Sequence, residues 1–219
     1  MTENDQKLLD RTLSLKRQFD QAIVTLANST LDLRIFFTMA HGYITGKIGQ
    51  NIELFANPNA LMRLNDSFAT TYLRALNGAA HLDWQRAFRV CKAESDAISS
   101  GFIGLIFVGP VAAESCGACM ANVHINRDLR DALLKVRDVD AQDYGNILVF
   151  VLEANLYAEC ELRGQAFGSA AIMISQLFVK RLNLDVKQWR NKVFQDCYKK
   201  QVPDPSKAFI DAYHKREGR

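Results

Sequence analysis

The stretch CMANVHINRDLRDAL, residues 119–133, carries a histidine and an aspartate at a spacing that can do chemistry. His124 and Asp128 are four positions apart, so they share one face of a helix with about 3.6 residues per turn. A carboxylate bound to one ring nitrogen orients an imidazole, and the other nitrogen can then act as a general acid or base near neutral pH. The same pair could also supply two ligands to a metal ion. The alternative is an ordinary helical pair that contributes a few tenths of a kcal/mol.

Asn122 lies two residues before this histidine. On a helix it falls beside an apolar stripe that contains Ile125 and Leu129. A buried amide without hydrogen-bond partners costs about 1–3 kcal/mol, so an asparagine on a core face needs partners. We therefore count Asn122 among the candidate substrate-binding residues.

A second polar stripe runs along the otherwise apolar segment DYGNILVFVLEANLYAECEL. At helical spacing one face carries Asp143, Asn146, Phe150, Glu153 and Tyr157. Such a stripe is either the solvent side of a packed helix or the polar wall of an internal pocket. In the pocket interpretation, Glu153 or Tyr157 is a second proton donor, and Asp143, Asn146 and Phe150 contact the substrate.

The two stripes are joined by the short segment VRDVDAQ, so their helices are expected to be antiparallel neighbours. On that geometry, His124 and Asp128 lie opposite Phe150 and Glu153. We therefore predict that the pair lines an internal cavity together with residues of the 143–157 helix.

An earlier segment, about residues 33–55, places Arg34 and His41 on one apolar helical face. A histidine in such a place is usually a hydrogen-bonded core residue. An arginine there must find a partner for its charge. Both residues are included as candidate substrate-binding groups.

The five cysteines do not suggest a metal centre. CGAC, with Cys116 and Cys119, precedes His124, but no second CxxC or HxxxH completes four zinc ligands. We expect no metal, no stoichiometric zinc and no cofactor. An odd cysteine count without a secretory signal argues against a disulfide framework, so the cysteines are interpreted mainly as small buried hydrophobes.

Helical periodicity recurs in every long segment, and strand patterns are nearly absent. The sequence predicts helices at about 6–27, 33–55, 59–76, 84–98, 110–136, 142–162, 170–182 and 186–201, followed by a short last helix. Gly117 and the HINRD stretch are expected to kink the 110–136 helix. The predicted fold class is all-α, with residues 1–219 forming a single-domain bundle of roughly eight to ten helices.

Charge and hydropathy limit the classes of partner that the sequence predicts. The chain has 27 basic and 24 acidic residues, and this balance does not predict nucleic-acid binding. The longest apolar run, GFIGLIFVGPVAA, is shorter than the roughly 20 residues that span a bilayer, so it is interpreted as a buried core segment. With no signal peptide visible, a cytoplasmic location without membrane association is expected. The oligomeric state stays open, a homodimer included.

The chain resembles the uncharacterised bacterial and fungal domain-of-unknown-function family numbered 5995. FFTMAHGYITGKI, LMRLNDSFATTYLRALNG with DWQRAF, NVHINRDL and DYGNIL resemble its motifs in the same order, over about residues 36–150. The resemblance implies a shared site at Asn122, His124, Asp128, Asp143 and Asn146, but no reaction. Two departures stand out: a longer stretch before the third motif, and Cys116 where many members carry a further histidine.

Two interpretations follow. In the first, the protein is a cofactor-independent lyase, cyclase or hydrolase for a small, largely apolar molecule, in a specialised-metabolite pathway. His124 would be the general base or acid, with Asn122 and Asn146 holding substrate oxygens. In the second, the protein is a non-catalytic small-molecule-binding or structural protein in which the same residues form a buried polar network. A deep apolar pocket with convergent polar groups favours the first, and a filled core around His124 favours the second.

Overall fold

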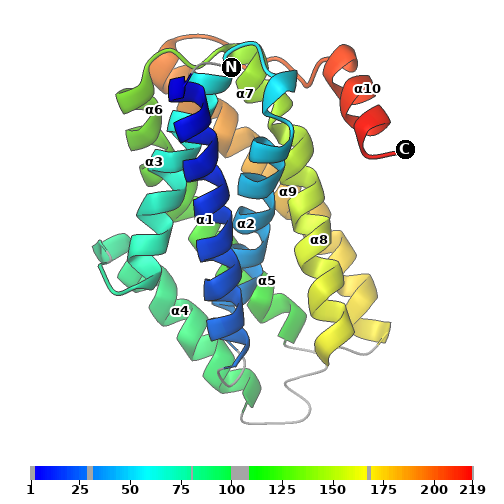
Figure 1. Cartoon of the computed structure of the whole chain (residues 1–219). Coiled ribbons are helices and arrows are strands. Elements are labelled where there is room, and N and C mark those ends of the chain that lie inside the picture. Colours follow the sequence, from blue (N-terminus) through cyan, green and yellow to red (C-terminus); the bar gives the residue numbers. More distant parts are fainter. Residues whose placement is uncertain (1–2, 29–31, 80, 100–108, 167–168, 219) are drawn as a thin grey trace.

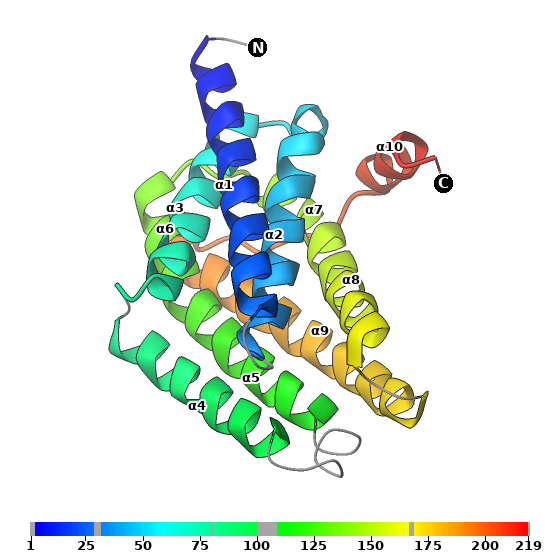
Figure 2. The same cartoon turned by 60° about the horizontal axis from the view of Figure 1, so that its bottom comes forward.

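The computed structural model describes residues 3–28, 32–79, 81–99, 109–166 and 169–218. Within these ranges every regular element is helical and no strand occurs, which confirms the all-α prediction (Figure 1). The helices form two layers. Helix α2 lies between α1 and α8 in one layer, and α5 lies between α4 and α9 in the other (Figure 2).

Helices α1 (Glu3–Ala27) and α2 (Arg34–Gln50) approach each other closely. At Gly42, an added Cβ would stand 2.9 Å from the Cβ of Phe19, so only glycine allows this separation. A short 3-10 helix, η1 (Ile52–Leu54), follows α2. Helix α3 (Pro58–Leu76) then begins at Asn57, whose side chain accepts a hydrogen bond from the backbone N–H of Ala60.

The next part of the chain forms the second layer. Helix α4 (Leu82–Ser99) packs against α5 (Gly109–Val123). A π-helical turn, η3 (His124–Leu129), links α5 to α6 (Arg130–Val136). The predicted kink therefore takes the form of a π-turn over the HINRD stretch. Such turns are rare and are found frequently at functional sites.

A disulfide joins Cys91 of α4 to Cys116 of α5, with 4.9 Å between their Cα atoms. Both cysteines are buried, as predicted, but the expectation that they would be unlinked is wrong. They pair because adjacent helices bring their Cβ atoms together, which cysteine number alone does not reveal. The disulfide ties α4 to the helix that leads into His124.

The last part closes the bundle. Helix α7 (Ala141–Asn146) is capped by Asp140, whose carboxylate accepts from the N–H groups of Gln142 and Asp143. Helix α8 (Leu148–Ala166) packs against α2, and α9 (Ser169–Tyr198) packs against α5 and η3. Helix α10 (Lys207–Arg216), capped by Ser206, lies at one end of the bundle (Figure 1).

Several predicted boundaries are wrong. The expected 142–162 helix is divided into α7 and α8, and the break before residue 186 does not occur because α9 continues to Tyr198. The helix expected at about 84–98 begins at Leu82, so Asp83 lies inside the first turn of α4. The interpretation of GFIGLIFVGPVAA as buried core concerns side chains outside the described residues.

Candidate functional site

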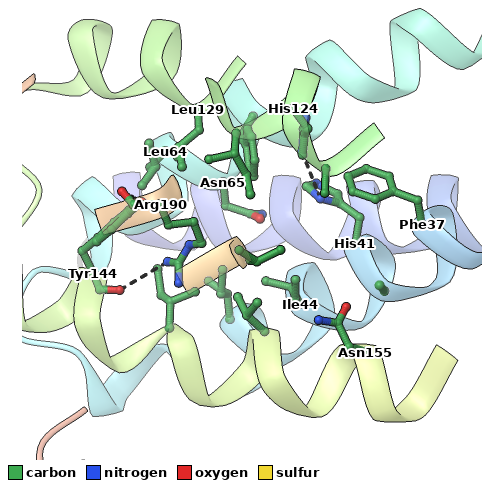
Figure 3. Close-up of a pocket in the computed structure, with 18 of the residues that line it drawn as sticks. Phe37, His41, Ile44, Leu64, Asn65, His124, Leu129, Tyr144, Asn155 and Arg190 are labelled. Atoms are coloured by element: carbon green, nitrogen blue, oxygen red, sulfur yellow. Dashed lines mark hydrogen bonds between the residues drawn. The ribbon is translucent and has the colours of Figure 1, made fainter. Parts of the chain in front are cut away.

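A chain of four buried side chains lies where α2, α4 and η3 meet. The indole N–H of Trp84 donates to Asp128 Oδ2 over 3.0 Å. The same oxygen lies 2.9 Å from His124 Nδ1. The other nitrogen of that ring, Nε2, lies 3.1 Å from Nδ1 of His41 (Figure 3). The pair predicted from (i, i+4) spacing is therefore formed and extends to a second histidine.

The π-turn positions this chain. His124 and Asp128 are its first and fifth residues, and their side chains project to the same side. His124 is 2% exposed and Asp128 is 3% exposed. An exposed pair of this kind would have little rigidity, whereas burial fixes both side chains in one geometry.

Aromatic rings enclose the two histidines. The ring of Phe68 stacks on that of His124 with 3.5 Å between centroids. Phe37 meets the His124 ring edge-on at 5.3 Å, and Phe19 lies 4.8 Å from the His41 ring. These rings remove the imidazoles from water, so the surroundings favour their uncharged forms.

The electrostatics of the chain follow from this burial. Burial lowers the pKa of His124 well below its usual range, and it lowers the pKa of His41 likewise, with a further contribution from the neighbouring His124. Burial also raises the pKa of Asp128 to about 6, although the Trp84 hydrogen bond and the charge of Arg127 oppose the rise. At pH 7 both imidazoles are therefore neutral and the carboxylate is mostly ionised.

These charge states define the direction of each hydrogen bond. An ionised Asp128 only accepts, so His124 Nδ1 carries a proton and donates it. Neutral His124 then accepts at Nε2 from the Nδ1–H of His41. The remaining nitrogen, His41 Nε2, is left with a free lone pair, and it has no hydrogen-bond partner among the described residues. The chain thus ends in an unpartnered base.

Both histidines belong to the wall of a partly open cavity of about 100 Å³ between the two helical layers. The wall is mainly apolar, with Ile44, Ile48, Leu64, Leu129 and Val151 among its side chains. A cavity of this size and lining suits a small organic molecule.

Three further polar side chains reach this cavity: Asn65, Asn155 and Arg190 (Figure 3). The amide oxygen of Asn65 accepts from Thr45 Oγ1 at 3.3 Å, while its amide nitrogen has no partner among the described residues. The Asn155 amide donates to Asn183. The wall therefore offers hydrogen-bonding groups at separate points around an apolar centre.

The predicted cavity wall is correct for His124, wrong for Asp128, which lies behind the wall as the partner of His124, and only partly correct for the later helix. Tyr144, Ile147, Val151 and Asn155 line the cavity, whereas the predicted neighbours Phe150 and Glu153 do not. The prediction that the two polar stripes belong to adjacent antiparallel helices is wrong. Helix α8 packs chiefly against α2 and α9, and the cavity separates it from the His124 turn.

Glu153 and Tyr157 belong to other surroundings. The carboxylate of Glu153 accepts from Tyr43 at 3.1 Å and from the hydroxyl of Tyr213 at 2.5 Å. Tyr157 is 39% exposed and stacks on Tyr43. The geometry does not bring either residue to the His124 chain.

Asn122 is exposed and lies at a separate surface hollow, so its predicted place on a core face is wrong. The π-turn that follows changes the helical phase on which that prediction rested.

Asp143 is buried and accepts from the backbone N–H groups of Ala56 and Asn57. Asn146 accepts from Gln142 and from the N–H of Ser206. Both polar groups hold loops in place, away from the cavity.

The remaining candidates also have other partners. Arg34 forms an ion pair with Asp32 at 2.6 Å, which answers the question of where its charge is matched. Phe150 is fully buried and packs against Phe55, Phe209 and Tyr213. Of the ten predicted site residues, His124, Asp128 and His41 are brought together.

Sequence reasoning missed Trp84 and Arg190. No spacing in the sequence links Trp84 to Asp128, which lies 44 positions away. The sequence does contain a pattern that points to Arg190. This residue lies in the apolar stripe of α9 together with Val186 and Phe194, which are both buried. A cation within such a stripe needs a partner, the same argument that was applied to Arg34.

No cluster of three or more potential metal-ligating residues is found in the part of the chain that the structure describes. No helix within the described ranges has the length and hydropathy needed to cross a membrane. Comparison of the chain with protein-family models, curated proteins and solved structures finds no match.

Proposed function

We propose that this protein is an enzyme that acts on a small, largely apolar organic substrate by acid/base chemistry. The observation that carries the proposal is the buried chain from Asp128 through His124 to His41. It ends beside an apolar cavity in a nitrogen that has no partner among the described residues. Buried, neutral imidazoles with one oriented nitrogen are suited to general base and acid catalysis.

In the proposed mechanism the chain works as a proton relay. His41 Nε2 accepts a proton from the substrate, while its Nδ1 proton passes to Nε2 of His124. The positive charge then lies on His124, beside the carboxylate of Asp128. In surroundings of low dielectric constant, that ion pair stabilises the charged state far more than it would in water. Return of the proton to a different substrate atom completes an isomerisation, a cyclisation or a dehydration, and transfer through water supports a hydrolysis.

A second candidate function is a non-catalytic ligand-binding or structural role. The close stacking of Phe68 on His124 favours it, because a ring at 3.5 Å covers one face of the imidazole. In that case the polar chain fixes how α2, α4 and η3 pack, as buried polar networks do in other cores.

One substitution separates the two candidates. His124→Ala removes the relay, and His214→Ala on α10 is the matched control, since that histidine lies outside the cavity wall. Each protein is incubated with a cell extract of small metabolites, and untargeted mass spectrometry records which compounds are consumed. We expect the wild type and the control to consume the same compound and His124→Ala to lose at least about 100-fold in rate.

The structural candidate predicts a different result. No compound is then consumed by any of the three proteins, and His124→Ala lowers the free energy of unfolding by about 1–3 kcal/mol through stranded partners. Consumption that is equal in all three folded proteins would contradict the catalytic proposal.

The biological setting is also part of the proposal. We place the reaction in a specialised-metabolite pathway in the cytoplasm, with the protein as a monomer or a homodimer. The Cys91–Cys116 disulfide sets a condition on this location, because reducing compartments usually keep thiols free. Full burial of both sulfur-bearing residues would protect the bond there by limiting access to thiols.

A further inference from the structure

We propose that the ligand of the cavity is a small monocarboxylate with an apolar body, and that Arg190 binds its carboxylate. This inference rests on the proposed function in that both use the same cavity. It adds the chemical class of the molecule and a binding residue that lies apart from the histidine pair.

Arg190 is a buried cation with too few partners. The residue is 7% exposed, and among the described residues its guanidinium makes one hydrogen bond, a long one of 3.4 Å from Nη2 to the carbonyl oxygen of Tyr144. It also stacks over the Tyr144 ring, with 4.6 Å from Cζ to the centroid. A guanidinium has five N–H donors, so the described residues leave most of its hydrogen-bonding capacity unused.

No carboxylate of the described residues forms an ion pair with the buried Arg190. The half-buried Arg34, by contrast, forms an ion pair with Asp32. A buried cation without an opposite charge is costly, and a ring face compensates for only about 2 kcal/mol of that cost. A bound anion would remove the imbalance.

The charges around the cavity favour a ligand with a single negative charge. Neither aspartate nor glutamate is found among the described residues of its wall. His41 and His124 line it in their neutral forms, which leaves Arg190 as the positive group. The planar fork of a guanidinium matches the two oxygens of a carboxylate, and a single cation balances a carboxylate better than a phosphate dianion.

The arrangement of the wall places the carboxylate away from the reacting end. In Figure 3, Arg190 and Tyr144 lie at one side of the cavity and His41, His124 and Phe37 at the other. The apolar side chain of Ile44 and the amide of Asn65 lie between them, and the apolar Leu64 lies beside Arg190. A molecule with its carboxylate on Arg190 would therefore extend an apolar body toward the histidines.

Volume limits the size of that body. The cavity measures about 100 Å³, while a dry protein cavity of about 150 Å³ holds benzene. Short branched acids come closest to this space, because aromatic acids are larger than benzene. Isobutyrate and isovalerate are suitable probes, and their amides are neutral molecules of nearly the same shape.

The test is isothermal titration calorimetry of the folded protein with each acid and its amide, with inorganic phosphate as a further arm. The wild type is compared with Arg190→Met, which removes the charge, and Arg190→Lys, which keeps it. Arg74→Met is the control, because that arginine is exposed on α3. We expect the wild type and the control to bind at least one acid about tenfold more tightly than its amide. Arg190→Met should bind the two equally, and Arg190→Lys should keep part of the preference.

The possible results separate the carboxylate proposal from the proposed function. Equal binding of acid and amide to the wild type would overturn the carboxylate proposal and leave an apolar cavity that takes small molecules, as the proposed function requires. Tighter binding of phosphate than of either acid would also overturn it. Binding of none of the probes by the folded wild type would remove the cavity as a ligand site, and with it the proposed function. If Arg190→Met does not fold, the wild type and Arg190→Lys still provide the comparison of acid with amide.

Discussion

Two carboxylates of this protein, the buried Asp128 and the half-buried Glu153, both bind aromatic side chains, yet their surroundings differ. Asp128 accepts from the indole of Trp84 and joins a histidine chain at the cavity wall. Glu153 accepts from the hydroxyls of Tyr43 and Tyr213, outside that wall. From sequence alone both carboxylates are candidate catalytic groups, since each lies on a segment with polar and apolar faces. Their neighbours show that a buried carboxylate becomes a candidate for catalysis when its partner can exchange protons near neutral pH.

Removal of each carboxylate is expected to give the largest difference. Asp128→Ala strands the Nδ1–H of His124 and the indole N–H of Trp84, both buried, at a cost of about 1–3 kcal/mol each. Glu153→Ala should cost about 1 kcal/mol, because a hydroxyl can rotate to another acceptor. Urea denaturation measures both values, and equal losses would contradict this view of the two sites.

The disulfide provides a second test of the same comparison, since it lies on the Trp84 side of the molecule. The pair encloses a loop with a sequence separation of 25 residues, so Cys91→Ala/Cys116→Ala should lose on the order of 3 kcal/mol. Hydrogen exchange should rise in α4, α5 and η3 and stay nearly constant around Glu153. Uniform loss of protection over the whole bundle would show that the two regions are not independent.

A third test uses pH. The pKa of Asp128 is raised to about 6 in the folded protein, so folded Asp128 binds its proton more tightly than unfolded Asp128. The stability that this proton contributes is complete below about pH 4 and is lost as pH rises through about 6. Relative to Asp128→Asn, the wild type should therefore lose on the order of 2 kcal/mol between pH 4 and pH 7.

The lowered pKa values of His41 and His124 act in the opposite direction, because their neutral forms are favoured by folding and stability is lost as pH falls below about 6.5. Both proteins retain these histidines, so the difference between the two unfolding curves isolates Asp128. A difference that grows as pH falls from 7 to 4 in favour of Asp128→Asn would show that the sign is wrong.

The smallest expected effect comes from removing one hydrogen-bond donor to each carboxylate. Trp84→Phe removes one hydrogen bond to Asp128 and should cost about 1 kcal/mol, and it should raise the pKa of the carboxyl further, because that bond favours the charged form. Carbon-13 NMR of the labelled aspartate follows the titration. Tyr43→Phe, the matched change at Glu153, should leave the Asp128 titration as it is in the wild type.

The sequence by itself determined the helical class, because apolar residues at a period near 3.6 bury one face of each segment whatever the arrangement of the helices. It also determined that His124 and Asp128 share a face, since four positions place two side chains together on an α-helix and, as η3 shows, on a π-turn. The tertiary structure decided everything that depends on contacts between distant segments. His41 and Trp84 lie 83 and 44 positions from their partners in the chain, and no local period specifies such pairings. The same reason explains Glu153 and Arg190: burial of a polar group is visible in the pattern, but the group that satisfies it is chosen by packing.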